Sequence, residues 1–124
     1  MEKKYTVQDI LIGMFSFFPE YVTYYKDKGR NFNEFFFEKR NDYSVLNHLA
    51  FDSDGIFPES KELNEGYDGL MKTGLLFSNT CIPSTRFLSL NAINVSFKYS
   101  KKRFSGKELG ELEDLSSEFR DVFC

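Results

Sequence analysis

Cysteine, histidine and tryptophan are nearly missing from this chain of 124 residues, which has two Cys, one His and no Trp. Two cysteines are too few for a disulfide scaffold, so we expect Cys81 and Cys124 to be reduced thiols of a cytoplasmic protein. A structural zinc site needs about four Cys, His or carboxylate ligands at short paired spacings. His48 has no C-x-x-C pair to join, so the sequence predicts no metal site.

Long apolar runs are also missing. Charged residues such as Asp9, Glu20 and Lys26 interrupt every hydrophobic stretch before it reaches the ~20 residues that span a bilayer. The stretch after Lys3 and Lys4 contains Asp9 and lacks the small-residue cleavage site of a signal peptide. We therefore expect neither a contact with the membrane nor secretion.

Short catalytic and nucleotide-binding motifs are missing as well. The chain contains no G-x-x-x-x-G-K-[ST], G-x-G-x-x-G, G-x-S-x-G or H-E-x-x-H sequence. His48 and Cys81 could pair as base and nucleophile, but no orienting Asn or Asp is identifiable, and a hydrogen-bonded core histidine is the simpler interpretation. We therefore expect a protein that is not an enzyme and carries no cofactor.

Aromatic residues, in contrast, are abundant, with fifteen Phe and seven Tyr. Such side chains bury large areas, either in a core or at an interface. The consecutive residues Phe35, Phe36 and Phe37 cannot all face one way on a regular element. We expect at least one of them to be exposed and to bind a protein partner, and a fully buried segment is the alternative.

The charge balance is slightly acidic, with a net charge of −3 at pH 7. Small domains that bind phosphate backbones are usually basic, so this balance disfavours nucleic acid as a partner. The basic residues are nevertheless clustered. The densest cluster comprises Lys98, Lys101, Lys102 and Arg103. A local basic patch that contacts phosphates therefore stays an alternative.

The spacing of apolar residues predicts a series of short elements. They are a helix over 7–18 that begins with a capping box at Thr6 and Asp9, a second or kinked helical segment through 26, an ambiguous segment at 32–39, a short helix between 42 and 51, a turn at 52–55, a helix over 61–73 that ends at Gly74, strands at 75–77 and 86–90, a segment over 91–99, and a helix from 106 to 122. For residues 91–99 the alternation of apolar residues favours a strand or an irregular segment, whereas Asn91 could equally cap a helix.

The last of these helices begins with a second capping box, Ser105 and Glu108. Its apolar stripe is formed by Leu109, Leu112, Leu115, Phe119 and Val122. Such a stripe must be covered, either by the chain's own core or by a second subunit. We favour the second subunit and predict a homodimer, with Leu109, Leu112 and Phe119 as contact residues.

Two glycines, Gly66 and Gly69, lie three residues apart inside the predicted helix 61–73. Each costs ~1 kcal/mol relative to alanine. Close packing of another backbone against this face would explain both glycines, whereas a pair of tolerated surface glycines is the alternative.

Over residues 42–90 the expected order is two helices, the second of them capped by Gly74, and then a two-stranded hairpin with Pro83 in its loop. Together with the preceding helix, this order resembles that of winged-helix domains. The resemblance implies a mainly helical α+β fold with a small antiparallel hairpin and an added C-terminal amphipathic helix. We expect one domain over 1–124, because no linker or repeat divides the chain.

In DNA-binding members of this class the third helix enters the major groove and carries basic or amide side chains. Here the corresponding helix contains Glu62, Glu65 and Asp68, which would repel phosphates. The sequence therefore favours a small accessory or regulatory protein that binds another protein. The alternative is a winged-helix DNA-binding regulator or antitoxin-like protein that uses the cluster from Lys98 to Arg103.

Overall fold

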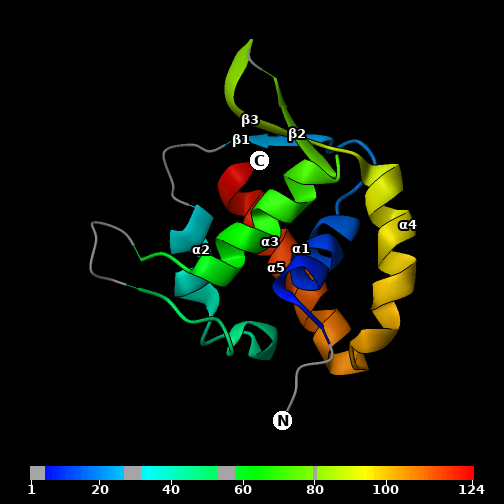
Figure 1. The fold of residues 1–124 in the computed structure, drawn as a ribbon. Coiled ribbons are helices and arrows are strands. Elements are labelled where there is room, and N and C mark those ends of the chain that lie inside the picture. Colours follow the sequence, from blue (N-terminus) through cyan, green and yellow to red (C-terminus); the bar gives the residue numbers. More distant parts are fainter. Residues whose placement is uncertain (1–4, 27–31, 53–57, 80) are drawn as a thin grey trace.

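The computed structural model describes residues 5–26, 32–52, 58–79 and 81–124, which form a mainly helical α+β fold (Figure 1). Its helices are α1 (Val7–Ser16), α2 (Phe32–Lys39), α3 (Lys61–Lys72), α4 (Leu90–Ser100) and α5 (Gly106–Phe123), with single 3-10 turns at η1 (Ser44–Leu46) and η2 (Lys101–Arg103). The strands are β1 (Tyr24–Lys26), β2 (Leu76–Asn79) and β3 (Ile82–Leu88). The predicted fold class is confirmed, including the long C-terminal helix.

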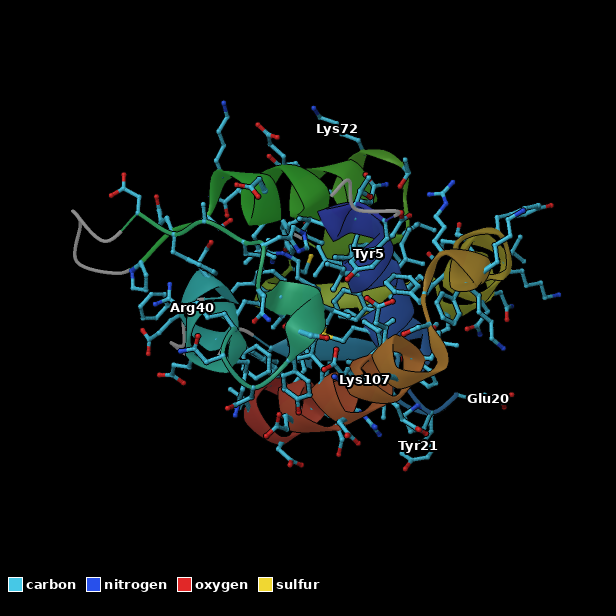
Figure 2. All side chains as sticks on the ribbon, turned by 90° about the horizontal axis from the view of Figure 1, so that it is seen from below. Tyr5, Glu20, Tyr21, Arg40, Lys72 and Lys107 are labelled. Carbon is cyan, nitrogen blue, oxygen red and sulfur yellow. The ribbon has the colours of Figure 1, made fainter. Side chains whose placement is uncertain are left out.

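Helix α1 is the central element, because it packs against α3, α4 and α5 (Figures 1 and 2). It begins at the predicted capping box, in which Asp9 N donates to Thr6 Oγ1 (3.1 Å) and Thr6 N donates to Asp9 Oδ2 (2.9 Å). Leu11, Met14 and Phe15 are completely buried. An apolar helix of this kind is stabilised mainly by the partners that surround it.

Close contacts between helices explain three glycines. A Cβ on Gly66 would lie 3.1 Å from Val7 Cγ1 and 3.3 Å from the backbone nitrogen of Gln8. On Gly69 it would lie 2.5 Å from Gln8 Oε1, and on Gly13 it would lie 2.7 Å from Leu112 Cδ1. The expected close approach of another backbone is therefore confirmed at Gly66, where it comes from the N-terminal turn of α1, whereas at Gly69 the neighbouring atoms belong to the flexible Gln8 side chain.

Helix α3 begins and ends as its sequence predicts. Ser60 caps it by accepting a hydrogen bond from Leu63 N (3.3 Å). Gly74 follows with a φ of +79°, a left-handed conformation that favours glycine after a helix end. The chain then turns directly into β2.

The sheet has the order β1-β3-β2, and both pairings are antiparallel. The predicted hairpin is confirmed, with longer strands and a shorter turn than expected. The helical segment predicted through residue 26 is wrong, because Pro19 follows the end of α1 and Tyr24 to Lys26 form β1. Only Tyr25 of this strand is buried, and the strand order places β1 at an edge of the sheet, paired with β3.

Helix α4 replaces the strand or irregular segment predicted over 91–99. The alternation of Ile93, Val95, Phe97 and Tyr99 indicated a strand. In the helix, Ile93 and Phe97 lie on the face that packs on α1, while Val95 and Tyr99 are exposed four residues apart on the other side. The apparent period of two was therefore produced by two separate helical faces.

The segment between β1 and α3 also differs from its prediction. The ambiguous residues 32–39 form α2, whereas the short helix expected between 42 and 51 is reduced to the single turn η1. The turn predicted at 52–55 lies largely outside the described residues. Beside it, Asp52 and Glu59 form an antiparallel bridge through their backbones, with N–O distances of 2.7 and 2.9 Å.

No helix among the described residues combines the length and the apolar character that crossing a bilayer requires.

Candidate functional site

The apolar stripe of α5 is covered by the chain's own core. Leu112, Leu115 and Phe119 are completely buried within the protomer, and Leu109 and Val122 are half-buried. In the protomer Leu112 and Phe119 therefore have no exposed surface for a partner. The homodimer stays a prediction.

The aromatic segment of α2 is also turned inward. Phe35 and Phe36 are buried, so Phe37 is the one residue of the three that is partly exposed, and its binding to a partner stays a prediction. Phe37 is half-buried, because the guanidinium of Arg40 lies 4.0 Å from its ring centroid and Phe51 packs at 5.3 Å. A helix can bury two consecutive Phe side chains when neighbouring elements pack on adjacent sides of it.

His48 and Cys81 do not form a common site. Cys81 is exposed in the turn between β2 and β3, whereas His48 follows η1 at the opposite end of the molecule (Figure 1). The half-buried His48 ring packs edge-on against Tyr5, with the ring centroids 6.0 Å apart. Neither Cys81 nor Cys124 forms a disulfide within the described part of the chain.

Three carboxylates of α5 accept hydrogen bonds from residues in the first half of the chain. Glu111 accepts hydrogen bonds from Ser44 Oγ (2.7 Å) and from the backbone nitrogens of Ser44 and Val45 (3.0 and 3.2 Å). Glu108 accepts one from Tyr5 Oη (2.8 Å). Glu118 accepts from Tyr43 Oη and from Lys39 Nζ, the latter at 3.3 Å. These carboxylates therefore connect α5 to the first half of the chain and stabilise the fold.

Two of these contacts predict a stability change at alkaline pH. Burial raises the pKa of Tyr5 and of Tyr43 well above the usual value for tyrosine, and the hydrogen-bonded Glu108 and Glu118 raise them further. The unfolded chain releases these protons near pH 10, before the folded chain does. The free energy of unfolding should therefore fall above about pH 10, by about 1.4 kcal/mol per pH unit for each tyrosine.

Urea unfolding between pH 9 and 11 measures this slope. The double variant Tyr5→Phe with Tyr43→Phe should lose most of it, because it cannot release these two protons. The matched control is Tyr21→Phe with Tyr99→Phe, in which both hydroxyls are removed from exposed positions. Equal slopes in the two double variants would contradict the prediction.

The solvent face of α3 is predominantly acidic. Glu62, Glu65 and Asp68 are exposed, and Lys61 of the same helix lies 3.9 Å from Glu65. This face does not have the positive potential that a phosphate backbone requires.

The basic cluster occupies the end of α4 and the turn η2. Lys98, Lys101 and Lys102 are exposed and form no ion pair with the described residues. Arg103 donates to Asp9 Oδ2 at 2.9 Å. This ion pair joins η2 to α1 and partly neutralises the charge of Arg103. Tyr99, which is 73% exposed, lies among these cations on α4.

The basic cluster belongs to a longer stretch of the chain that contains no carboxylate. Residues 69–107 include no Asp or Glu and seven Lys or Arg, whereas the remaining 85 residues hold all nineteen carboxylates. This stretch runs from the last turn of α3 through β2, β3, α4 and η2 to the start of α5. The signal is visible in the sequence, although inspection of local clusters alone misses it.

An aromatic row crosses the outer face of the sheet. In the register of the strands, Tyr24 of β1 and Phe77 of β2 both lie opposite Phe87 of β3. The ring centroids of Tyr24 and Phe87 are 6.0 Å apart, and those of Phe77 and Phe87 are 5.5 Å apart with the rings stacked. Tyr24 and Phe77 are 48% and 47% exposed, while the neighbouring Tyr25 and Leu76 point into the core. The row depends on strand register, and sequence reasoning missed it.

Comparisons of the chain with protein-family models, with curated proteins and with solved structures find no match.

Proposed function

We propose that this chain is a non-enzymatic protein-interaction module that binds an apolar, acidic segment of another protein on the aromatic row. The observation that carries the proposal is the exposure of Tyr24 and Phe77 on either side of Phe87. Exposed neighbouring aromatic side chains are typical of protein contact sites, because they bury large areas when a partner covers them.

The fold supports a winged-helix type of scaffold for this module. The element order α1-β1-α2-α3-β2-β3 and the sheet order β1-β3-β2 support this scaffold. Helices α4 and α5 are additions to it. In this scaffold α3 takes the place of the helix that DNA-binding members insert into the major groove. Its carboxylates favour a protein partner over DNA.

The charge of the sheet indicates the chemistry of the partner. The three strands contain no carboxylate, whereas they contain Lys26 and Arg86. Lys26 is exposed two residues after Tyr24 and therefore lies on the same face as the aromatic row. A segment with aliphatic or aromatic side chains beside Asp or Glu would match both the row and this charge.

Selection of a random peptide library on the purified protein tests this proposal. We expect enriched peptides that combine apolar residues with Asp or Glu, and their affinity should fall about tenfold or more in Phe77→Ser. The matched control is Tyr21→Ser, which removes an 85% exposed aromatic side chain outside the strands and should leave affinity unchanged. Enrichment of basic peptides, or equal effects of the two variants, would contradict the proposal.

The basic cluster supports a second candidate, a DNA-binding regulator or an antitoxin-like protein. Lys98, Lys101 and Lys102 are exposed together beside Tyr99, in a stretch without carboxylates. A submicromolar complex with a defined duplex at about 0.15 M salt would favour this candidate. That complex should then weaken in Lys101→Glu with Lys102→Glu and remain intact in Phe77→Ser.

A further inference from the structure

A cleft of about 230 Å³ lies under the inner face of the sheet, away from the aromatic row. It is bounded by β1, β3, α2, α3 and the last turn of α5. Aromatic rings form two of its sides. Phe32 and Tyr67 pack at a centroid distance of 5.2 Å, and Tyr25 and Phe123 pack at 6.1 Å. A flat apolar group could contact rings on both sides.

Three polar side chains that line this cleft, Arg86, Tyr67 and Asn64, can donate hydrogen bonds into it. Arg86 Nε donates to Tyr67 Oη, and Arg86 Nη1 donates to the carbonyl of Thr85 at 3.2 Å. The other N–H groups of this guanidinium have no acceptor among the described residues. Because Tyr67 Oη accepts from Arg86, its own O–H is left to donate elsewhere.

Asn64 adds a third donor through a fixed amide orientation. Asn33 Oδ1 accepts from the backbone nitrogen of Ser60 (2.8 Å), so Asn33 Nδ2 must be the atom that donates to Asn64 Oδ1 (2.8 Å). The Nδ2 group of Asn64 then remains as a donor at the cleft. No hydrogen bond to it occurs among the described residues.

Within the described ranges, no carboxylate balances the charge of Arg86. No carboxylate of the described residues lines the cleft or forms an ion pair with this partly buried guanidinium. A partly desolvated cation beside two further donors is stabilised by an anion, and a planar guanidinium suits a carboxylate in two-point geometry.

We propose that this cleft is a binding site for a small organic carboxylate with a flat apolar body. The carboxylate accepts hydrogen bonds from Arg86, Tyr67 and Asn64, and the body lies between the aromatic rings. This site is separate from the aromatic row, so it extends the proposed function by a second ligand of a different class. Its size, below the ~300 Å³ of typical drug-sized pockets, limits the ligand to about one ring.

Titration with benzoate, followed by amide chemical shifts in NMR, tests the site. We expect saturable shifts at residues of β3, α2 and α3, and binding of the neutral isostere benzamide that is weaker by about tenfold or more. Arg86→Gln should weaken benzoate binding by a similar factor. The matched control Arg40→Gln, which removes a guanidinium outside the cleft that lies over the Phe37 ring, should leave the affinity within about twofold.

Tyr67→Phe keeps the ring and removes the O–H, so it tests the site even where Arg86→Gln fails to fold. It should weaken benzoate binding by about threefold to tenfold and affect benzamide binding less. Absence of saturable binding up to about 20 mM benzoate overturns the proposal. Equal binding of benzoate and benzamide, or binding of inorganic phosphate in place of benzoate, overturns the proposed ligand class. These results leave the peptide-binding proposal unaffected, because its variants lie on the other face of the sheet.

Discussion

Replacing Phe119 by alanine is expected to lower the free energy of unfolding by about 3–5 kcal/mol. Phe119 is completely buried and lies at the centre of the aromatic core. Its ring centroid is between 4.5 and 6.3 Å from those of Phe15, Phe18, Tyr25, Phe32, Phe35, Phe36 and Phe123. These rings come from α1, the segment that follows it, β1, α2 and α5, so alanine leaves a cavity that no single element can fill by moving.

Urea unfolding at neutral pH measures the loss, and Phe77→Ala is its matched control. Phe77 is 47% exposed and stacks on Phe87 alone among the described rings, so its removal should cost about 1 kcal/mol or less. Because small domains are stable by only about 5–15 kcal/mol, Phe119→Ala should be partly unfolded at moderate urea concentrations. Similar midpoints for the two variants would show that the aromatic core is not centred on Phe119.

The helix ends could be predicted from the sequence because their signals are local. Thr6 with Asp9 and Ser105 with Glu108 form both hydrogen bonds of a capping box, as their spacing predicts. Gly74 follows α3 for a similarly local reason, the left-handed conformation that its lack of a Cβ permits. None of these features depends on a residue far away in the sequence.

Strand β1 and helix α4 could not be predicted in this way. Tyr24 to Lys26 become a strand because β3, about sixty residues later, supplies the hydrogen-bond partners. Residues 91–99 become a helix because α1 covers the face with Ile93 and Phe97. In both cases tertiary contacts decided the structure of a segment whose local pattern allowed another one.

The candidate sites also divide into features that can be predicted from the sequence and features that depend on tertiary contacts. The cationic character of residues 69–107 is a property of composition and can be read from the sequence. The aromatic row requires the register that brings Tyr24 and Phe77 opposite Phe87, and the cleft requires Arg86 and Tyr67 to meet from different elements. Phe35 and Phe36 were predicted to bind a partner because they belong to a run of aromatic residues. Their burial depends on the elements packed around α2, which the local sequence does not show.

Leu112→Glu is expected to unfold the protein. Leu112 is completely buried, and its Cδ1 atom fills the space over Gly13, where a Cβ would lie only 2.7 Å away. A carboxylate at this position has no room to reach water. It must either stay charged in the core or become protonated, and both options cost several kcal/mol, on the order of the total stability of a small domain.

Circular dichroism and sedimentation velocity of wild type and variant decide between this expectation and the dimer interpretation of the α5 stripe. The matched control is Leu109→Glu, on the same helix but only half-buried, and it should remain folded at a cost of about 1 kcal/mol. If the stripe belonged to a dimer interface, Leu112→Glu would instead yield a folded monomer from a dimeric wild type. A folded Leu112→Glu monomer would therefore show that α5 leaves its place in the core and exchanges between protomers. An unfolded variant beside a folded Leu109→Glu would place the stripe in the protomer's own core, and any dimer would then have to use another surface, such as the exposed aromatic row.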